Sequence, residues 1–556
     1  MTQDSEVFRP DAKSILEVFG NVDSYYQIPD YQRPYSWTDK QISDLWEDLY
    51  AAMEAEDPSY FLGPIILIQK PDGYYEVVDG QQRLTTLTIL FCVVRDLYEK
   101  EIRKRDSRLA ERIVNSIISN VDKEDRLKLI TQAKSQNEFK EEVLKEVRFP
   151  EGPLSQKEKK KQPFMNAAQL FKERLADLRR QGRIHLVISF LNYLFTRVDV
   201  ITITCSRQAQ AIKLFQVINT RGLDLSNADL VKSYLYGRVL NKKEGDQFIA
   251  TWNEIETVSK DMDESIDDLL TYYEYFLLAS NPRKTVYEEL EAKFKKRDPN
   301  EVIYDFRTFV DSYKKLYDKK SKVVYTLWYL PNQVYWKAII TTAIKEDFKN
   351  IDGLTREIRR FYYCYWIGGF YISKIKQFSF NIIGWIKEGR DLAFIKNSLD
   401  HKLVEDKVAD RVRENIANDA YDANWLKPLL VMIEYEKTDG SKLEFLELNR
   451  NIHVDHILPE KWSTVSYWKS RWSNEDATAW LNRMGNLTLL SGRKNCSAQN
   501  WAFDKKKDVY RGKGFDGTTA FLITQALLSK RDWTTRQVKA RQKSLVIEAE
   551  RLLKVG

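Results

Sequence analysis

Two polar clusters near the end of the chain combine residue types that could hydrolyse a phosphodiester bond. One is Asp455-His456 within NIHVDHILP, and the other runs from Asn486 in MGNLTLL to Asn495, nine residues later. Such hydrolysis needs a base that activates water and a divalent cation that neutralises the developing oxyanions. His456 offers an imidazole that titrates near neutrality, while Asp455 and Asn495 offer hard oxygen ligands. Without a cysteine pair, Mg²⁺ or Mn²⁺ fits better than zinc.

The order and spacing of these residues resemble the His-Asn-His (HNH) nuclease motif, a ββα unit that holds one metal ion. The resemblance implies that His456 is the general base and that Asn486 braces the loop behind it. It further implies that Asp455 and Asn495 bind the metal. Many members carry a second histidine where this chain has Asn495, so Asn500 competes for that ligand role.

Other polar residues flank this motif. His453 lies two residues before Asp455 and would point to the same side of a strand, but a structural histidine is favoured over a ligand or a substrate contact. Three lysines, Lys505, Lys506 and Lys507, follow on an expected helix. They would either neutralise DNA phosphates or form a solvated helix face, and the sequence does not favour one reading over the other.

A second candidate site lies near the start of the chain, where Asp79-Gly80-Gln81-Gln82-Arg83 runs from an expected strand through a tight turn into a helix. Exposed amides at a helix start, a permissive glycine and an arginine together predict an anion cradle suited to nucleotide phosphates. Asp79 would hold Mg²⁺ or cap the helix. The simpler alternative is an ordinary capped turn with Arg83 on the surface.

Three further segments accompany this turn: IPDYQRPYSW, FLG and FQVINTRGLDLSNADLVK. Together with the DGQQR turn and the nuclease motif, they resemble the GmrSD family of type IV, modification-dependent restriction enzymes, which have a ParB/sulfiredoxin-like N-terminal domain. The resemblance covers about residues 1–236 and 450–515. It implies that the DGQQR segment binds and hydrolyses a nucleoside triphosphate, and that this step regulates DNA cleavage by the C-terminal nuclease.

Carried over to this chain, the resemblance gives a set of nucleotide-binding candidates. Asn219 and Arg221, in the turn of INTRGLDLS, are weaker candidates, since Gly222 closing one helix before Ser226 caps the next explains that turn. The main candidates are Asp79, Gly80, Gln81, Gln82 and Arg83, with Gln32 and Arg33 as neighbours of the same site or of DNA.

The pattern of the whole chain predicts a multidomain α+β protein that is predominantly helical. Strand-like and helical signals alternate over residues 1–236, the expected ParB-like domain, which carries a helical insertion at about 99–185. The run at 155–163 is expected to be an exposed loop, with a basic arm that binds nucleic acid as the alternative. Residues 237–450 form a helical middle domain of unassigned role. Residues 451–556 form the nuclease domain.

Composition limits the class of protein. The chain has 556 residues and a net charge of +7, and this modest charge excludes a uniformly basic, histone-like molecule. The basic excess lies at the C-terminal end, where residues 451–556 hold 19 Lys and Arg against 10 Asp and Glu. Four widely spaced cysteines provide neither a disulfide framework nor a CxxC knuckle. The longest apolar run, 361–372, is too short to span a bilayer and predicts a buried helix. With no secretory signal, we expect a cytoplasmic protein without a membrane partner.

The sequence therefore predicts an anti-phage DNA endonuclease that acts on modified foreign double-stranded DNA, with Mg²⁺ or Mn²⁺ and a nucleoside triphosphate as cofactors. A double-strand cut needs two active sites, which would favour a homodimer. Two alternatives stay open. One is a nucleotide-dependent DNA-binding regulator with an inactive nuclease domain, and the other is an abortive-infection toxin nuclease that acts on host nucleic acid.

Overall fold

The computed structural model divides the chain into two compact units. Unit 1 comprises Met1–Thr251 with Lys296–Asn300, and unit 2 comprises Trp252–Lys295 with Glu301–Gly556. The structure describes residues 8–21, 23–70, 73–121, 124–206, 210–211, 214–215, 226–439, 443–448, 452–491, 500–512 and 520–556.

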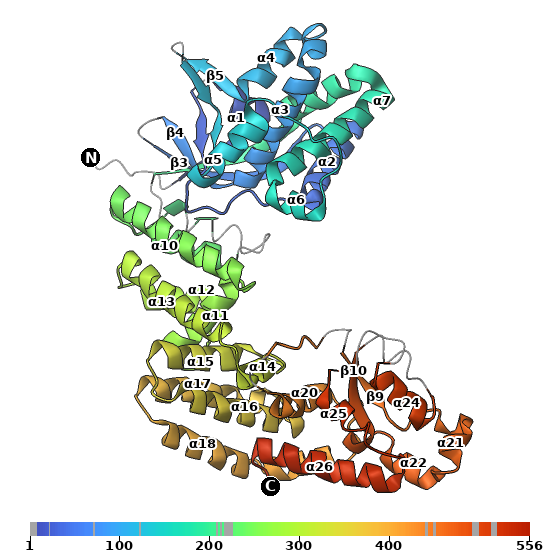
Figure 1. Cartoon of the computed structure of the whole chain (residues 1–556). Coiled ribbons are helices and arrows are strands. Elements are labelled where there is room, and N and C mark those ends of the chain that lie inside the picture. Colours follow the sequence, from blue (N-terminus) through green and yellow to red (C-terminus); the bar gives the residue numbers. More distant parts are fainter. Residues whose placement is uncertain are drawn as a thin grey trace. The chain divides into compact units, whose positions relative to one another are not determined.

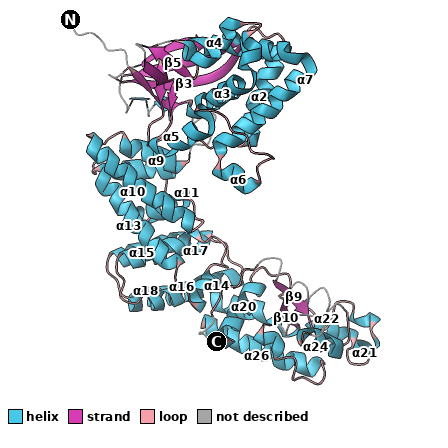
Figure 2. Ribbon diagram, turned by 45° about the horizontal axis from the view of Figure 1, so that its top comes forward, coloured by secondary structure: helices cyan, strands magenta, loops and turns pink. Residues whose placement is uncertain are grey.

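Unit 1 is built around a six-stranded mixed sheet with the strand order β1-β8-β3-β4-β2-β7 (Figure 2). β3 runs antiparallel to β4 and parallel to β8, and β2 runs parallel to β4 and β7. The elements are β1 Phe8–Ser14, α1 Ile15–Gly20, β2 Tyr25–Gln27, α2 Asp39–Glu54, β3 Tyr60–Gln69, β4 Tyr74–Asp79, α3 Gln81–Arg103, α4 Ser107–Asn115, β5 Ile118–Val121, β6 Glu124–Leu127, β7 Leu129–Ile130, α5 Ala133–Phe139, the π-helix Lys140–Leu144, α6 Gln156–Lys161, α7 Pro163–Arg197, β8 Val198–Cys205 and α9 Asn227–Tyr236, followed by α10 Lys242–Asp261, which crosses into unit 2.

Alternating side chains bury both faces of this sheet. Ile65 and Leu67 belong to the larger core, which also contains residues of α1, α2, α3, α4 and α7. Ile66 and Ile68 point to the opposite face and pack with Phe215. Helices on one side and Ala211, Leu214 and Phe215 on the other therefore pack around the edge where β4 ends and α3 begins.

Most sequence predictions for unit 1 are confirmed. The expected strands are β3, β4 and β8, the expected helix after DGQQR is α3, and Ser226 caps α9 by accepting a hydrogen bond from the Asp229 amide. Two predictions are wrong. The insertion at 99–185 also contains the short strands β5, β6 and β7, and the segment 155–163 forms α6 instead of a loop, because Ser155 and Glu158 make a capping box.

Unit 2 stacks helices and ends in a small hairpin domain (Figure 1). The last helix, α26, packs against α16, α19 and α20, so the nuclease segment and the preceding helices share one unit. The elements are α11 Ile266–Leu278, α12 Val286–Phe294, α13 Pro299–Tyr317, α14 Lys322–Leu327, α15 Val334–Lys345, α16 Ile351–Ile367, α17 Ser373–Lys387, α18 Leu392–Glu405, α19 Val408–Ala417, α20 Leu426–Lys437, β9 Ile452–His456, the 3₁₀ helix Trp462–Thr464, α21 Ser466–Lys469, α22 Asn474–Trp480, the 3₁₀ helix Met484–Asn486, β10 Leu487–Ser491, α24 Phe503–Tyr510, α25 Leu522–Gln525 and α26 Thr535–Leu553.

The aromatic run at 361–372 is only partly the buried helix that the sequence predicts. α16 ends at Ile367, and the chain then turns through Gly369, whose φ of +73° suits a glycine. The part of the run inside α16 is buried except for the half-buried Trp366. Across the described ranges, none of the helices combines the length and the apolarity needed to cross a membrane.

Candidate functional site

The nuclease candidates sit on a two-stranded antiparallel hairpin followed by a helix. β9 pairs with β10, which places His456 opposite Leu487 and Asp455 opposite Thr488. The helix α24 comes next among the described elements. Two strands and a helix thus bring Asp455 and His456 together at the end of β9.

Asn486 holds the chain that follows His456. Its backbone oxygen accepts from the Ile457 amide at 2.8 Å, and its side-chain oxygen accepts from the Leu458 amide at 2.8 Å. Its side-chain amide donates to the Leu458 carbonyl at 3.0 Å. Since Asn486 is completely buried, these bonds are shielded from water and fix the turn directly after His456.

The imidazole of His456 is held in one orientation. Its Nε2 lies 3.0 Å from Oδ1 of Asn482, and its ring lies against the ring of Tyr421 with 4.1 Å between the centroids. Because an amide oxygen only accepts, this contact assigns the proton to Nε2 and leaves the lone pair on Nδ1. The nearest carboxylate, on Glu460, lies 3.9 Å from Nδ1.

Burial lowers the pKa of His456 below its ordinary value of 6.5. The Asn482 hydrogen bond and the charges of Glu460 and Asp455 act in the opposite direction but do not cancel the cost of burying an imidazolium. At neutral pH the ring is therefore uncharged, which is the form that accepts a proton from water.

Asp455 is held from α24. Nζ of Lys506 and the hydroxyl of Tyr510 both donate to its Oδ2, each at 3.2 Å. Lys506 also donates to the backbone oxygen of His456. Burial lowers the pKa of Lys506, which the Asp455 carboxylate partly offsets.

Asp455 and His456 open into one pocket of about 220 Å³ that Asn500 also lines. Asn500, the competing ligand candidate, is therefore close to the proposed metal position, whereas Asn495 lies outside the described residues. His453 does not line this pocket. The remaining lining residues are Tyr421, Val454, Pro459, Glu460 and Lys506.

The donor set fits a hard divalent cation. Mg²⁺ commonly binds through one or two carboxylates and completes its shell with waters and substrate phosphate oxygens. Asp455 supplies such a carboxylate, and Asn500 and Glu460 bring further oxygen atoms to the pocket. Among the residues that the structure describes, no group of three His, Cys, Asp or Glu side chains is arranged to hold a metal ion. Among those residues, no metal site is formed by these side chains alone.

The lysine run of α24 is not the solvated helix face that was one reading of the sequence. Lys506 is completely buried and bonded to Asp455, and Lys507 is 8% exposed and donates to the Lys530 carbonyl. Lys506 also lines the pocket that holds Asp455 and His456. Only Lys505 points outward, over the ring of Trp501. The pattern could not show this, because α24 packs into a core that is assembled from distant residues.

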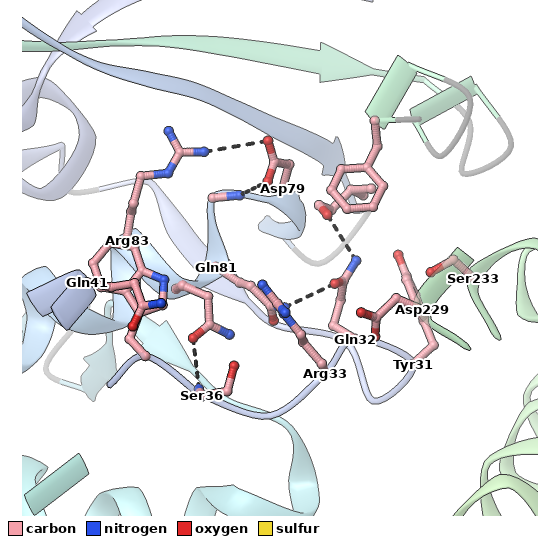
Figure 3. A pocket seen from close by; sticks show the side chains of 15 residues that line it. Tyr31, Gln32, Arg33, Ser36, Gln41, Asp79, Gln81, Arg83, Asp229 and Ser233 are labelled. Carbon is pink, nitrogen blue, oxygen red and sulfur yellow. Dashed lines mark hydrogen bonds and ion pairs between the residues drawn. The ribbon is translucent and has the colours of Figure 1, made fainter. Parts of the chain in front are cut away.

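In unit 1, all seven main nucleotide candidates line one pocket of about 350 Å³ (Figure 3). In that view Arg83 and Asp79 lie on one side, and Asp229 and Ser233 of α9 on the other. Phe215 also lines the pocket, so segments from both ends of the domain meet there. Asn219 and Arg221 lie outside the described residues.

The start of α3 leaves backbone donors at this pocket. Gly80 is the N-cap residue, with a φ of +90° and no capping side chain, and its own amide donates to Oδ1 of Asp79 at 2.7 Å. A Cβ at Gly80 would lie 3.0 Å from Cγ1 of Ile65. The first amides of a helix have no partner within the helix, so the start of α3 offers backbone donors to this pocket.

The two glutamines of DGQQR organise the neighbouring loop. Gln81 donates to Oε1 of Gln32 at 3.2 Å, and Gln32 donates to the Val78 carbonyl at 2.9 Å. Gln82 accepts from the Ser36 amide at 2.9 Å and donates to the Pro34 carbonyl at 3.2 Å. Both glutamines thus fix the segment that carries Gln32 and Arg33 against α3.

Arg83 has a structural role that the sequence did not predict. Its guanidinium donates to the carbonyls of Leu62 at 3.0 Å and Pro64 at 2.7 Å, and it lies 3.5 Å from the Asp79 carboxylate. A Cβ at Gly63 would lie 2.2 Å from Nη1, so only glycine leaves room for this arginine. Arg83 is neither on the surface nor uncommitted.

Arg33 is the more accessible cation of the pocket. The side chain of Arg33 is exposed, and its guanidinium makes no hydrogen bond or ion pair with any residue that the structure describes. Its charge acts on Asp79 together with that of Arg83, but burial dominates and raises the pKa of Asp79.

Sequence reasoning missed several residues around His456. Asn482 and Tyr421 lie 26 and 35 residues from it in the chain, and no local pattern connects them to the motif. Tyr510 shares Asp455 with Lys506 but reads as an ordinary core aromatic. Of the residues around His456, only Glu460 lies close to it in the sequence, four residues later.

Both ends of the chain match family models. The model described as the GmrSD restriction endonuclease N-terminal domain matches residues 15–236, and the model of the C-terminal domain matches residues 406–547. The chain belongs to the GmrSD restriction endonuclease family. It is thus a DNA-cleaving enzyme of phage defence. No curated protein matches the chain.

The match to the GmrSD C-terminal domain begins 45 residues before the boundary that the sequence suggests at 451. Contacts explain why these residues belong with the hairpin. The Ala420 amide donates to the Asn482 carbonyl, and Lys427 donates to the Ile452 carbonyl. Tyr421, on the same segment, packs on His456.

Proposed function

We propose that this GmrSD-family enzyme cleaves DNA by metal-dependent hydrolysis, with His456 as the general base and Asp455 as a ligand of Mg²⁺ or Mn²⁺. The observation that carries the proposal is the pocket that holds both residues, in which Oδ1 of Asn482 lies 3.0 Å from Nε2 of His456 and burial lowers the pKa of the imidazole. The β9–β10 hairpin with α24 supports an HNH-type ββα arrangement for this domain.

We assign parts in the reaction to His456, to Asp455 and to the residues bonded to them. Nδ1 of His456 takes the proton of the attacking water while Asn482 stabilises the Nε2–H of the resulting imidazolium. Lys506 and Tyr510 fix the carboxylate of Asp455. When bound there, the cation would neutralise charge on the phosphate oxygens. Asn486 keeps the turn after the base rigid.

For the N-terminal domain, which we propose to be ParB-like, we propose binding and hydrolysis of a nucleoside triphosphate that regulates cleavage. The uncapped start of α3 and the exposed Arg33 support a phosphate position, and Asp79 is close enough to Arg83 to be oriented by it. A ligand can regulate the nuclease only if it binds two conformations with different affinity, typically by about 1 to 3 kcal/mol.

We propose modified phage DNA as the target, following the type IV class to which the family belongs. Cleavage of plain, methylated, glucosylated and phosphorothioate DNA, with each nucleotide in turn, tests both halves of the proposal. A nuclease that cuts all substrates equally with and without nucleotide would contradict the regulatory half. Intact Asp455, His456 and Asn486 argue against an inactive nuclease domain.

A further inference from the structure

A second hollow, of about 720 Å³, lies in unit 2 between α26 and the segment that runs from α25 to Trp533. Its apolar lining includes Ile523, Leu527, Trp533 and Leu545, each at most 5% exposed. The volume falls within the range of about 300 to 1,000 Å³ that is common for small-ligand sites. The nuclease mechanism proposed above does not use this hollow.

The ionisable residues that line the hollow are all basic: Lys437, Lys530, Arg536 and Arg541. Lys437 is paired with Glu548 at 2.9 Å. Lys530 and Arg536 are exposed, and their side chains make no hydrogen bond or ion pair with any described residue. Two uncommitted cations thus stand at the rim of an apolar floor, with no carboxylate among the lining residues.

Arg541, the fourth basic residue, has a structural role in one wall of the hollow. The guanidinium of Arg541, a half-buried residue, donates to the carbonyls of Gly485 at 3.0 Å and Leu487 at 2.6 Å. Arg541 therefore ties one wall of the hollow to the segment that contains Asn486.

Two further hydrogen bonds join the hollow to the active-site elements. Nε1 of Trp533 donates to Oδ1 of Asn486 at 3.0 Å, the same oxygen that holds the turn after His456. The Lys530 carbonyl accepts from Lys507 at 3.0 Å, next to Lys506 on α24. A molecule in the hollow would thus touch Trp533, which is bonded to Asn486, and Lys530, which is bonded to α24.

We propose that this hollow binds one nucleotide of the DNA taken out of the base stack, with phosphates on Lys530 and Arg536 and the base against the apolar floor. The two rim cations call for an anionic ligand, and the floor calls for an apolar body attached to it. A polynucleotide provides both, and DNA is the polyanion on which this family acts. The inference rests on the DNA-cleaving function proposed above.

DNA binding by the full chain tests the rim, with His456→Ala present in every variant so that DNA stays intact. Lys530→Ala with Arg536→Ala should weaken binding roughly tenfold or more, since charge-assisted contacts are lost. The slope of log affinity against log salt should fall by about 2. The matched control is Lys539→Ala with Lys543→Ala, two exposed lysines of α26 outside the hollow. An equal effect of both pairs, or none of the rim pair, overturns the proposal.

A second variant tests the interior of the hollow. Ala540 is exposed on α26 and lines the hollow, so Ala540→Trp fills the space without changing charge or core. Because a mismatched base costs less to extrude, the protein should prefer a mismatched duplex over a paired one, and Ala540→Trp should lose this preference. Lys543→Trp is the control and should keep it. If Ala540→Trp retains the preference for the mismatched duplex, the proposal is overturned. Because this is a binding measurement, its outcome does not depend on the effect of His456→Ala on cleavage.

Discussion

Nζ of Lys506 lies 3.2 Å from Oδ2 of Asp455 and is completely buried there. Tyr510 shares the same oxygen at the same distance, and Lys506 also reaches the backbone oxygen of His456. Thus α24 is bonded to both Asp455 and His456 of β9. The orientation of Asp455 depends on this helix as much as on the hairpin.

Lys506→Met should lower the free energy of unfolding of unit 2 by about 3 to 5 kcal/mol, because it leaves a largely buried carboxylate without its cation. Denaturant unfolding followed by tryptophan fluorescence measures this. Lys505→Met, the exposed neighbour, should stay within about 0.5 kcal/mol of wild type. If the two variants unfold at the same denaturant concentration, the Lys506 pairing is not structural.

Asn482→Ala should slow cleavage without weakening DNA binding, because the Nε2–H of His456 loses its acceptor. The loss should not exceed the roughly 10²- to 10⁴-fold that a general base contributes. Asn482→Asp keeps an acceptor and adds a negative charge, which should raise the pKa of His456 and move the acid limb of the rate profile upward. Asn474→Ala, at an exposed helix start, is the control. An unshifted acid limb in Asn482→Asp would argue against this contact.

The pH dependence of cleavage should follow His456. Burial lowers its pKa, so the neutral, active form persists below the ordinary 6.5, and the rate should fall only at lower pH. Because the imidazole has its ordinary, higher pKa in the unfolded state, the unfolded protein takes up this proton at a higher pH than the folded protein. The contribution of His456 to the free energy of unfolding is therefore fully present above pH 6.5 and is lost as the pH falls through the lowered pKa. Single-turnover rates from about pH 5 to about pH 8 test this. A half-maximal rate above 6.5 would contradict it.

Arg33 and Arg83 should separate ligand binding from structure in the N-terminal pocket. Arg33→Ala should weaken triphosphate binding by calorimetry and leave thermal unfolding unchanged, since the side chain is exposed. Arg83→Ala should lower both the affinity for the triphosphate and the unfolding temperature, because the bonds of Arg83 to the Leu62 and Pro64 carbonyls are lost. The outcome that sinks the nucleotide site is full triphosphate binding and hydrolysis by Arg33→Ala, or no binding by wild type.

Local patterns predicted the elements that carry the sites, because strand alternation and helix caps are written in short stretches. The strand before Gly80, the helix after it and the Ser226 cap are examples. The contacts that specify the sites come from distant segments. Asn482 reaches His456, and Gly63 makes room for Arg83, through the tertiary fold alone.

The lysines of α24 show the same limit. A run of three lysines indicates a solvated face when only composition is known. Lys506 is instead buried beside Asp455, where a carboxylate and a carbonyl repay part of the cost of desolvation. Nothing near Lys506 in the sequence names these partners, because both lie about fifty residues earlier.

We propose that His456 drives metal-dependent DNA cleavage, and nicking of supercoiled plasmid in Mg²⁺ or Mn²⁺ tests this role most directly. The prediction is that wild type nicks or cuts, that chelation of the metal stops it, and that His456→Ala loses about 10²- to 10⁴-fold in rate while retaining DNA binding. His453→Ala, which alters a histidine outside the pocket, should cut like wild type. Cleavage by His456→Ala at the wild-type rate, in preparations free of contaminating nuclease, would contradict the assignment.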